Sequence, residues 1–539
     1  AEKSRSYAAA LEGYLECLKR DPTSVRAMTR AAAVYYRRAE YATALRYASQ
    51  ALDFVMYDAD ANYIYGLIAR QMGDLTDAKE TMGWAARSMK YRAAAYCQLA
   101  EIYLLEGNLE RAEEYGKRSL EYDAKNIKTH QFLTTLYRRA GKPAQAEAAL
   151  KRVLEMDPLN HLARFENYLL KPGAGTLEEF RGLIRNEMPH ETYLERAATY
   201  RNLGLDEDAS RVLSVAPEQA EIRYWQAYLL RNKSPEESLR VLRQASVLSP
   251  YLVFPFRQEA IPVFEWASKT LPVDWKASYY LGLIEWGIER EADALKRFTA
   301  LGDRPDYAVF YASRAFLEQT GDPAKAEADY EKARSIDPAD WRNHNRLIAF
   351  QLARGMNAKA LASATQASER FPDQDQIKIA LARANLANGR YQACYETLNH
   401  ANVLPFEGQR DIQALYANCQ MALAIEAIKG RNFKLAEERL NGSKVYPEHL
   451  GTGRPADPDF RVQDYLLMLS HERAGGPENT HEAAARRAEC DAYSSGHSRR
   501  GMAELHGRLE TWAGTSLAQK EPLAALEDLR TIVRGPRGR

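Results

Sequence analysis

Small residues recur along this chain with a period of 34 residues. One series steps through Ala44, Ala78, Ala112 and Ala146. A second series marks a turn shortly before each of these, at Ala39, Gly73, Gly107 and Gly141. Between the marks, apolar residues lie three or four positions apart among charged ones, as in "GNLERAEEYGKRSLEYD", which is typical of an amphipathic helix. Each period therefore predicts two helices joined by a tight turn.

The small residues have a physical role at the crossing of the two predicted helices. The first helix of each pair carries Ala32, Gly66, Ala100 or Thr134 at that point. Small side chains let two helices pack closely, and larger ones would force them apart. Glycine permits the left-handed backbone that ends a helix, and Asp-Pro at 21–22, 157–158 and 337–338 ends one repeat before the next begins. A 34-residue period with these features is the tetratricopeptide pattern.

The same period returns in the second half of the chain. Gly321, Gly355 and Gly389 are one period apart, and so are Ala326, Ala360 and Cys394. Prolines and glycines interrupt the pattern at 167–184 and 249–280. The predicted fold class is all-α, a right-handed α-α superhelix (solenoid) of tetratricopeptide-like helical hairpins.

The regularity of the pattern predicts four regions. They are an N-terminal tetratricopeptide array at 1–165, an irregular helical middle with degenerate repeats at 166–275, a second array at 276–445, and a Gly/Pro-rich loop with a C-terminal helical segment at 446–539. Ala10 lies one period before Ala44, so the chain opens on the second helix of a repeat. This start predicts either a lone capping helix or the C-terminal part of a longer protein.

Several short motifs resemble a bacterial family of unknown function. The motifs are "ETYLERAATYRNLG", "YWQAYLL", "SPYLVFPFR", "DWKASYYLGLIEW" and "YPEHLGTGRP", and they span roughly residues 160 to 500. In that family, an N-terminal β-rich domain with a suspected carbohydrate connection precedes the tetratricopeptide repeats. The resemblance implies that this chain corresponds to the helical C-terminal region of such a protein. His449 stands where the family usually has asparagine.

Composition narrows the classes of partner. The chain has 539 residues, of which 46% are hydrophobic and 27% charged, and a formal net charge of +1. This balance supports a folded core without a general attraction to nucleic acid or to an anionic membrane. The most apolar stretch, "ALYANCQMALAIEAI", is too short and too polar for a membrane span. Five well-separated cysteines indicate reduced thiols and favour a cytoplasmic location.

The sequence carries no motif that predicts catalysis. It has no His-Glu-x-x-His pair, no closely spaced cysteines and no Gly-x-Ser-x-Gly turn. "GTGRPA" and "GAGTLE" lack the third glycine of a dinucleotide-binding loop. We therefore expect no metal and no cofactor, and predict that the chain is not an enzyme.

The interruption at 249–280 is rich in aromatic residues. They are Phe254, Phe256, Phe264, Trp266 and Trp275. Because they alternate with aliphatic residues, the pattern favours a local hydrophobic core, and the alternative is a surface that stacks sugar rings.

A helical solenoid favours binding as the class of function, because the first helices of stacked hairpins line a concave groove. The candidate groove residues are Arg26, Tyr36, Tyr63, Arg70, Lys128, Gln131 and Arg138. Arginine and tyrosine contribute much of the energy of protein interfaces. The mixture predicts a groove for an acidic or C-terminal peptide segment, with ordinary solvated side chains as the alternative.

The leading hypothesis is a non-enzymatic protein-protein interaction or scaffold module. It would bind a partner segment or a companion domain through the concave face of the superhelix. The alternative, which follows from the family resemblance, is a helical accessory part of a larger carbohydrate-active protein whose catalytic β-rich domain lies upstream. No nucleic-acid partner is expected, and self-association of stacked repeats is left open.

Overall fold

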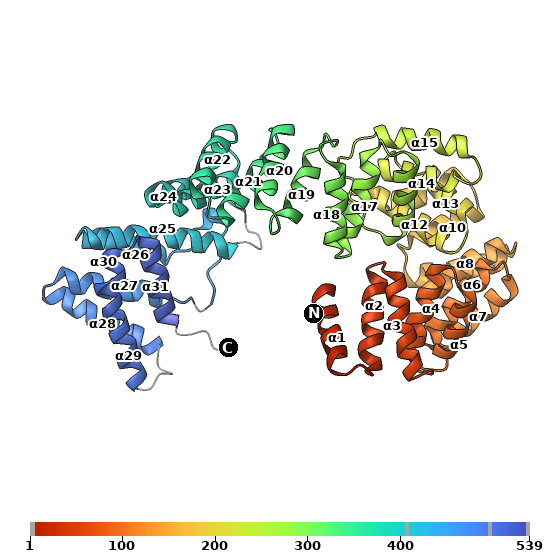
Figure 1. Cartoon of the computed structure of the whole chain (residues 1–539), viewed down its shortest axis with the longest axis horizontal. Coiled ribbons are helices and arrows are strands. Elements are labelled where there is room, and N and C mark those ends of the chain that lie inside the picture. Colours follow the sequence, from red (N-terminus) through yellow and green to blue (C-terminus); the bar gives the residue numbers. More distant parts are fainter. Residues whose placement is uncertain (1–5, 405–408, 457, 494–498, 535–539) are drawn as a thin grey trace. The chain divides into compact units, whose positions relative to one another are not determined.

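The secondary structure of this chain is helical in a computed structural model that describes residues 6–404, 409–456, 458–493 and 499–534. The chain divides into a first unit, Ala1–Pro305, and a second unit, Asp306–Arg539. Each unit is a series of antiparallel helical hairpins, and the described residues contain no strand (Figure 1). The predicted fold class, an all-α right-handed superhelix of tetratricopeptide-like hairpins, is confirmed.

The first unit spans the predicted N-terminal array, the predicted irregular middle and the first hairpin of the predicted second array, at 275–301. Its α-helices are α1 (Tyr7–Arg20), α2 (Val25–Arg37), α3 (Tyr41–Phe54), α4 (Ala59–Met72), α5 (Leu75–Ala85), α6 (Arg92–Leu105), α7 (Leu109–Tyr122), α8 (Ile127–Arg139), α9 (Pro143–Met156), α10 (His161–Leu170), α11 (Ala174–Gly182), α12 (Pro189–Asn202), α13 (Asp206–Ser214), α14 (Ala220–Leu230), α15 (Pro235–Val247), α16 (Ile261–Thr270), α17 (Trp275–Gly287) and α18 (Glu291–Leu301). A short 3-10 helix, η2 (Gln258–Ala260), leads into α16.

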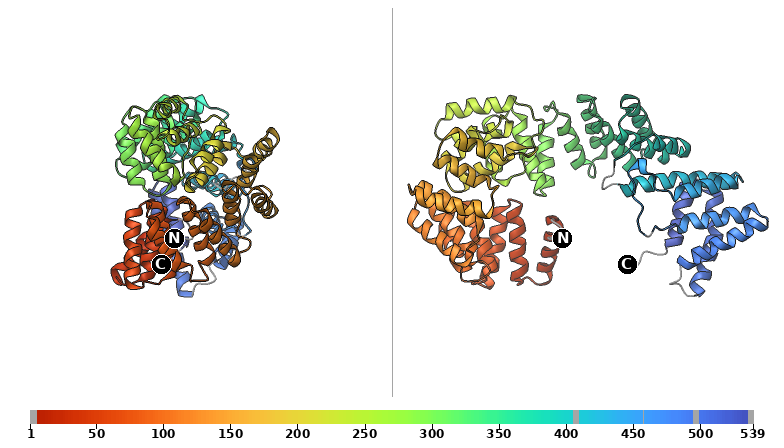
Figure 2. Two further views of the ribbon diagram at one scale, coloured as in Figure 1. Left: turned by 90° about the vertical axis from the view of Figure 1, so that its right-hand side faces the viewer. Right: turned by 180° about the vertical axis from the view of Figure 1, so that it is seen from behind.

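The second unit continues with the same kind of hairpin and ends in a helical segment. Its α-helices are α19 (Ala308–Glu318), α20 (Pro323–Ile336), α21 (Trp341–Ala353), α22 (Asn357–Arg370), α23 (Asp375–Ala387), α24 (Tyr391–Asn399), α25 (Gln409–Lys429), α26 (Phe433–Ser443), α27 (Arg461–Ala474), α28 (Pro477–Tyr493), α29 (Arg499–Gly514), α30 (Ser516–Gln519) and α31 (Pro522–Arg534). The 3-10 helix η3 (Glu448–Leu450) lies between α26 and α27. Figure 2 shows two further views of the hairpins.

The small residues of the repeat lie where paired helices cross. The alanine series on the second helices has no exposed surface at Ala44, Ala78, Ala112 and Ala146. On a first helix, a methyl group at Gly66 would come within 2.8 Å of the Met82 side chain of α5. The sequence period therefore locates the close contact of each hairpin.

The turns between paired helices adopt the predicted left-handed backbone. Gly73, Gly107 and Gly141 have φ angles of 86°, 77° and 68°. Ala39, the alanine member of this series, also takes a positive φ of 55°. Glycine adopts this region without a steric cost, whereas alanine does not.

The hairpin α17–α18 offers a direct test of this close packing. A methyl group at Gly282 would overlap the ring of Phe298, which has no exposed surface and so has little room to move. We expect Gly282→Ala to destabilise the first unit by about 1–3 kcal/mol, because overpacking forces the helices apart. Thermal unfolding followed by circular dichroism measures the change.

Gly287, at the end of the same helix, is the matched control. Nothing lies within 4 Å of a methyl group built there. Gly287→Ala is expected to leave stability unchanged or to raise it by up to about 1 kcal/mol, since alanine is the better helix former. Equal melting temperatures for the two variants would contradict the packing argument.

The Gly/Pro-rich stretch after α26 is a packed connection. Leu450 of η3 has no exposed surface and belongs to the hydrophobic cluster formed by α23, α24 and α25. The backbone N–H of Val403 donates to the His449 carbonyl at 2.7 Å, and the Thr452 hydroxyl donates to the Pro447 carbonyl at 2.9 Å. Gly451 takes a positive φ of 65°, which ends η3. These contacts seat the stretch against the last hairpins.

The cysteines and the helix lengths can be compared with two expectations from composition, namely reduced thiols and no membrane span. Cys97, Cys394 and Cys419 are buried, Cys17 is exposed, and all four are free thiols. The side chain of Cys490 lies outside the described residues. In the part of the chain that the structure describes, no helix combines the length and the apolar character that a bilayer crossing requires.

Candidate functional site

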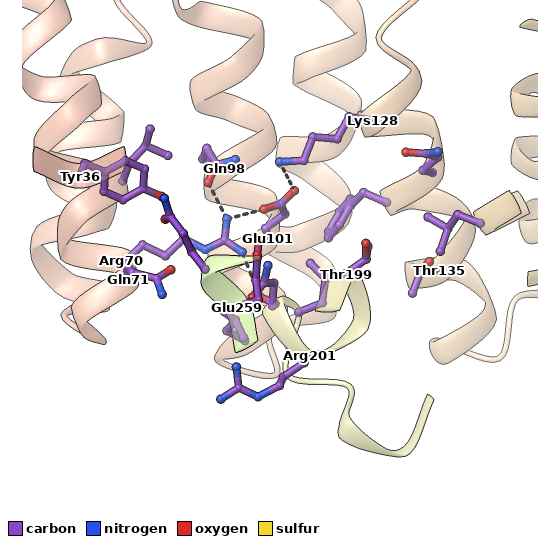
Figure 3. A pocket seen from close by; sticks show the side chains of 18 of the residues that line it. Tyr36, Arg70, Gln71, Gln98, Glu101, Lys128, Thr135, Thr199, Arg201 and Glu259 are labelled. Carbon is purple, nitrogen blue, oxygen red and sulfur yellow. Dashed lines mark hydrogen bonds and ion pairs between the residues drawn. The ribbon is translucent and has the colours of Figure 1, made fainter. Parts of the chain in front are cut away.

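A pocket of about 660 Å³ lies on the inner face of the first unit. One wall comes from the first helices of consecutive hairpins, α2, α4, α6 and α8, and from α10. The end of α12 and the η2–α16 segment provide the opposite wall (Figure 3). Pockets of this volume are typical of sites that take a small ligand.

An ion-pair network forms the base of the pocket. The Arg70 guanidinium donates to the Glu101 carboxylate and to the Gln98 amide oxygen, the latter at 2.5 Å. Lys128 Nζ lies 2.9 Å from the other oxygen of Glu101. A second nitrogen of Arg70 donates to the Asn202 carbonyl at 3.0 Å. Figure 3 shows Glu101 between the two cations.

The network keeps its members charged at neutral pH. Burial alone would raise the pKa of Glu101, but Lys128 and Arg70 hold this pKa below its ordinary value. Partial desolvation of its ammonium group would lower the pKa of Lys128, but the Glu101 carboxylate raises it. The positive charges of Arg70 and Lys128 are therefore partly neutralised within the protein.

The structure brings four of the predicted groove residues together around this pocket. Tyr36, Arg70, Lys128 and Gln131 line it. Gln131 also donates from its amide nitrogen to the Asn160 side-chain oxygen at 3.0 Å.

Two further predicted residues lie outside the pocket lining. Tyr63 stacks on Tyr91 with a centroid separation of 4.5 Å, and Arg26 is exposed. The pocket therefore includes some of the predicted groove residues, and Tyr63 and Arg26 are not among them.

Arg138, the seventh predicted residue, does not line the pocket and lies in a buried ion-pair network. Its Nε lies 2.5 Å from Glu166, and its Nη2 lies 2.8 Å from Asp208. Only 10% of its side chain is exposed, and that of Glu166 is fully buried. Thr135 and Tyr200 donate hydroxyl hydrogen bonds to the same Glu166 oxygen at 2.9 and 2.8 Å. Arg138 thus joins α8 to α10 and α13.

The second wall of the pocket consists of residues that the repeat pattern did not indicate. Arg201, Asn202, Gln258 and Glu259 come from the irregular middle of the chain, where no 34-residue register applies. The Gln258 side-chain amide donates to the Arg37 carbonyl, which fixes η2 against the end of α2. Only the folded superhelix brings these segments together, because more than 200 residues separate Arg37 from Gln258.

One corner of the pocket combines two tyrosines with a carboxylate. The rings of Tyr36 and Tyr41 lie 5.7 Å apart at 57°, and Glu259 of η2 lines the same pocket. Burial raises the pKa of Tyr41 to about 12, with further contributions from Tyr36 and Glu259. Burial and the Glu259 charge also raise the pKa of Tyr36, although Arg70 opposes them. Both phenols are therefore neutral at physiological pH. We call Tyr36, Tyr41 and Glu259 the tyrosine–glutamate corner.

The motifs that mark the irregular middle supply buried polar contacts. Arg257 forms an ion pair with Glu191 and donates to the Glu191 carbonyl at 3.3 Å. The Tyr224 hydroxyl donates to the Asp274 carboxylate. The first contact ties α12 to the chain segment before η2, and the second ties α14 to the start of α17, so the motifs have a structural role where the repeat pattern is lost.

A buried carboxyl group lies within this region. Glu221 of α14 is 1% exposed. Burial raises its pKa to about 8, the nearby Glu191 charge adds to the rise, and Arg257 opposes it. Glu221 is therefore largely protonated at neutral pH.

The aromatic interruption at 249–280 divides between core and surface. Phe264 is fully buried and packs against Tyr224 with centroids 5.4 Å apart. Phe254 and Phe256 are 40% and 56% exposed. The hydrophobic-core interpretation therefore describes Phe264, whereas these two phenylalanines remain at the surface.

Within the described residues, no group of three or more His, Cys, Asp and Glu side chains could hold a metal ion.

Comparison with known proteins identifies the repeat family along parts of the chain. Residues 65–126, 103–165 and 315–340 match tetratricopeptide repeat families. Similar solved structures include MamA, at 20% identity over 29% of this chain and 92% of that chain, with a TM-score of 0.28. The family assignment rests on the matched repeat segments.

Two other solved structures cover more of the chain. YrrB, described as a TPR protein with an unusual peptide-binding site, is 15% identical over 43% of this chain and 99% of that chain, with a TM-score of 0.27. The C-terminal part of a TPR repeat-containing protein from Cytophaga hutchinsonii is 14% identical over 64% of this chain and 96% of that chain, with a TM-score of 0.28.

Proposed function

We propose that this chain, which is a tetratricopeptide-repeat protein, is a non-enzymatic binding module that takes a segment of a protein partner into the concave face of its first unit. Proteins of this repeat type typically mediate protein-protein interactions. The binding site in this proposal is the pocket lined by α2, α4, α6 and α8 and closed by η2.

The observation that supports this proposal most strongly is that hydrogen bonds within the protein already hold a polar group of the pocket in place. Arg70 is held by Glu101, Gln98 and the Asn202 carbonyl, and its side chain is only 14% exposed. A site whose side chains are already ordered loses less conformational entropy on binding. The arrangement therefore suits recognition of a defined segment.

The remaining polar groups around this network suit a peptide. Gln71 and Gln131 line the pocket with amide groups that can bond to a peptide backbone. The side chain of Lys128 is 59% exposed, so a bound segment can contact it without any rearrangement of α8. These features favour binding over chemistry at this site.

The test is partner capture by a variant that removes two lining side chains. Lys128→Ala combined with Gln131→Ala leaves Glu101 paired with Arg70, so the fold is expected to persist. Capture from a lysate of the native cells, quantified by mass spectrometry, should fall at least about tenfold for the specific partner, which corresponds to about 1.4 kcal/mol.

A matched double variant on the outer helix α9 controls for nonspecific effects. Gln145→Ala with Lys151→Ala removes the same two residue types at exposed positions away from the pocket. It should capture the partner as the unchanged protein does. If the pocket variant retains every protein that the control retains, the concave-face proposal is wrong.

A further inference from the structure

We propose that the tyrosine–glutamate corner of the pocket binds a basic side chain, lysine or arginine, of the partner segment. This inference rests on the proposed function of the first unit and names the chemistry that the same pocket selects. It differs from the acidic segment that the sequence pattern suggests, because the structure shows which charges of the pocket are already paired.

The two carboxylates of the pocket lining differ in their environment. Glu101 is paired with both Arg70 and Lys128. Glu259, on η2, is partly buried and forms no hydrogen bond or ion pair with the side chains that the structure describes. A carboxylate that is partly withdrawn from water without a cation gains most from binding one. Glu259 is therefore the acceptor of the corner.

The tyrosine rings add a second attraction for a cation. Tyr36 and Tyr41 are tilted against each other at 57°, and both line the same pocket as Glu259. The face of an aromatic ring attracts an ammonium or guanidinium group, and the attraction grows when water is excluded. Two neutral rings and one carboxylate thus line the same pocket, and each of these groups attracts a basic side chain.

The basic groups of the pocket are engaged elsewhere. Arg70 and Lys128 share Glu101. Arg201 donates to the Tyr228 hydroxyl at 2.9 Å and lies 5.0 Å from the centre of that ring. Burial raises the pKa of Tyr36 and the positive charge of Arg70 opposes this rise, while Glu101 offsets part of the Arg70 charge. Among the described residues, Glu259 is therefore the carboxylate of the pocket lining that has no cation partner.

A binding experiment with labelled peptides tests the inference on the full chain. The probes are fluorescein-labelled hexalysine and hexaglutamate with capped ends, measured by fluorescence anisotropy. We expect hexalysine to bind more tightly than hexaglutamate. Glu259→Gln should weaken hexalysine binding about tenfold, whereas Glu110→Gln, an exposed position on the outer helix α7, should leave it unchanged.

A second pair of variants separates the ring from its hydroxyl. Tyr41→Phe keeps the aromatic face and should retain hexalysine binding, while Tyr41→Leu should reduce it about threefold or more. Circular dichroism melting of each variant shows whether the fold is kept. Equal hexalysine affinity in the unchanged protein, Glu259→Gln and Tyr41→Leu overturns the inference.

Two further outcomes identify other ligands. Tighter binding of hexaglutamate, lost in the Lys128→Ala and Gln131→Ala double variant, would overturn the basic-side-chain inference and leave partner binding by the pocket intact. Displacement of hexalysine by free spermidine at lower concentrations than by unlabelled hexalysine would assign the corner to a free polyamine and overturn the partner segment. Loss of partner capture in the double variant tests the proposed function independently of these probes.

Discussion

Replacing Arg138 with alanine is expected to lower the free energy of unfolding of the first unit by about 3–5 kcal/mol. The substitution removes the cation that faces two buried carboxylates, Glu166 and Asp208, which are 0% and 1% exposed. In urea unfolding followed by circular dichroism, the transition of the first unit should shift to a lower urea concentration.

The size of this effect follows from what the substitution leaves behind. Arg138 contacts Glu166 through two nitrogens, at 2.5 and 3.1 Å, and Asp208 at 2.8 Å. Burial alone would lower the pKa of Arg138, but Glu166 and Asp208 raise it, so the guanidinium is always charged. Without it, Glu166 would keep the hydroxyl hydrogen bonds of Thr135 and Tyr200. Asp208 would keep the more distant Arg211 at 3.9 Å. Two buried carboxylates that lose the cation between them cost far more than the loss of an exposed ion pair.

Arg139 provides the matched control because it is the next residue of the same helix and is exposed. Arg139→Ala should change stability by less than about 0.5 kcal/mol. Adding Glu166→Gln to the Arg138 variant should recover part of the loss, since the amide carries no charge. Similar urea midpoints for the Arg138 and Arg139 variants would contradict a structural role for this ion pair.

Replacing Glu221 with glutamine is expected to make the first unit more stable at pH 8 and to remove part of its pH dependence. Glu221 has a folded-state pKa of about 8, against an ordinary value of 4.5. A rise of this size corresponds to on the order of 5 kcal/mol between the two protonation states. Glutamine has nearly the shape of the protonated acid and never ionises.

The direction of the pH effect follows from the raised pKa. The folded state holds the Glu221 proton more tightly than the unfolded state, so this contribution to stability is fully present below pH 4.5 and is lost as the pH rises toward 8. Glu191 adds to the repulsion once Glu221 ionises, and Arg257 relieves part of it. Melting temperatures of the two proteins should therefore differ little at pH 5 and diverge by pH 8.

Glu236→Gln serves as the control for this experiment, because Glu236 is an exposed glutamate in the first turn of the neighbouring helix α15. Its pH profile should follow that of the unchanged protein. A constant difference in melting temperature between the Glu221 variant and the unchanged protein from pH 5 to pH 8 would show that Glu221 does not titrate in this range.

The regular part of the fold could be predicted from sequence because its causes are local and periodic. The alanine series from Ala44 to Ala146 lies at helix crossings, and the glycine series from Gly73 to Gly141 lies at left-handed turns, as expected. Tyr36, Arg70, Lys128 and Gln131 were placed on the inner face by their positions in the repeat, and all four line the pocket.

Residues with the same repeat position can still differ in their partners. Arg70 and Arg138 are two periods apart and occupy equivalent places on α4 and α8. Arg70 faces the pocket with Glu101, whereas Arg138 pairs with Glu166 and Asp208 inside the protein. Register alone could not separate them, because it gives the direction of a side chain and not the element that packs opposite.

The helical hairpins, their turns and the inward face of each first helix can be predicted from the sequence, because they follow from residue size, backbone freedom and helical period within about 34 residues. The tertiary structure is needed to see that η2 closes the groove into a pocket, that Glu259 lines this pocket together with Tyr36 and Tyr41, and that Arg138 is buried. The reason is physical: these contacts join residues far apart in the chain, and the path of the irregular middle, which no periodicity describes, sets which of them meet.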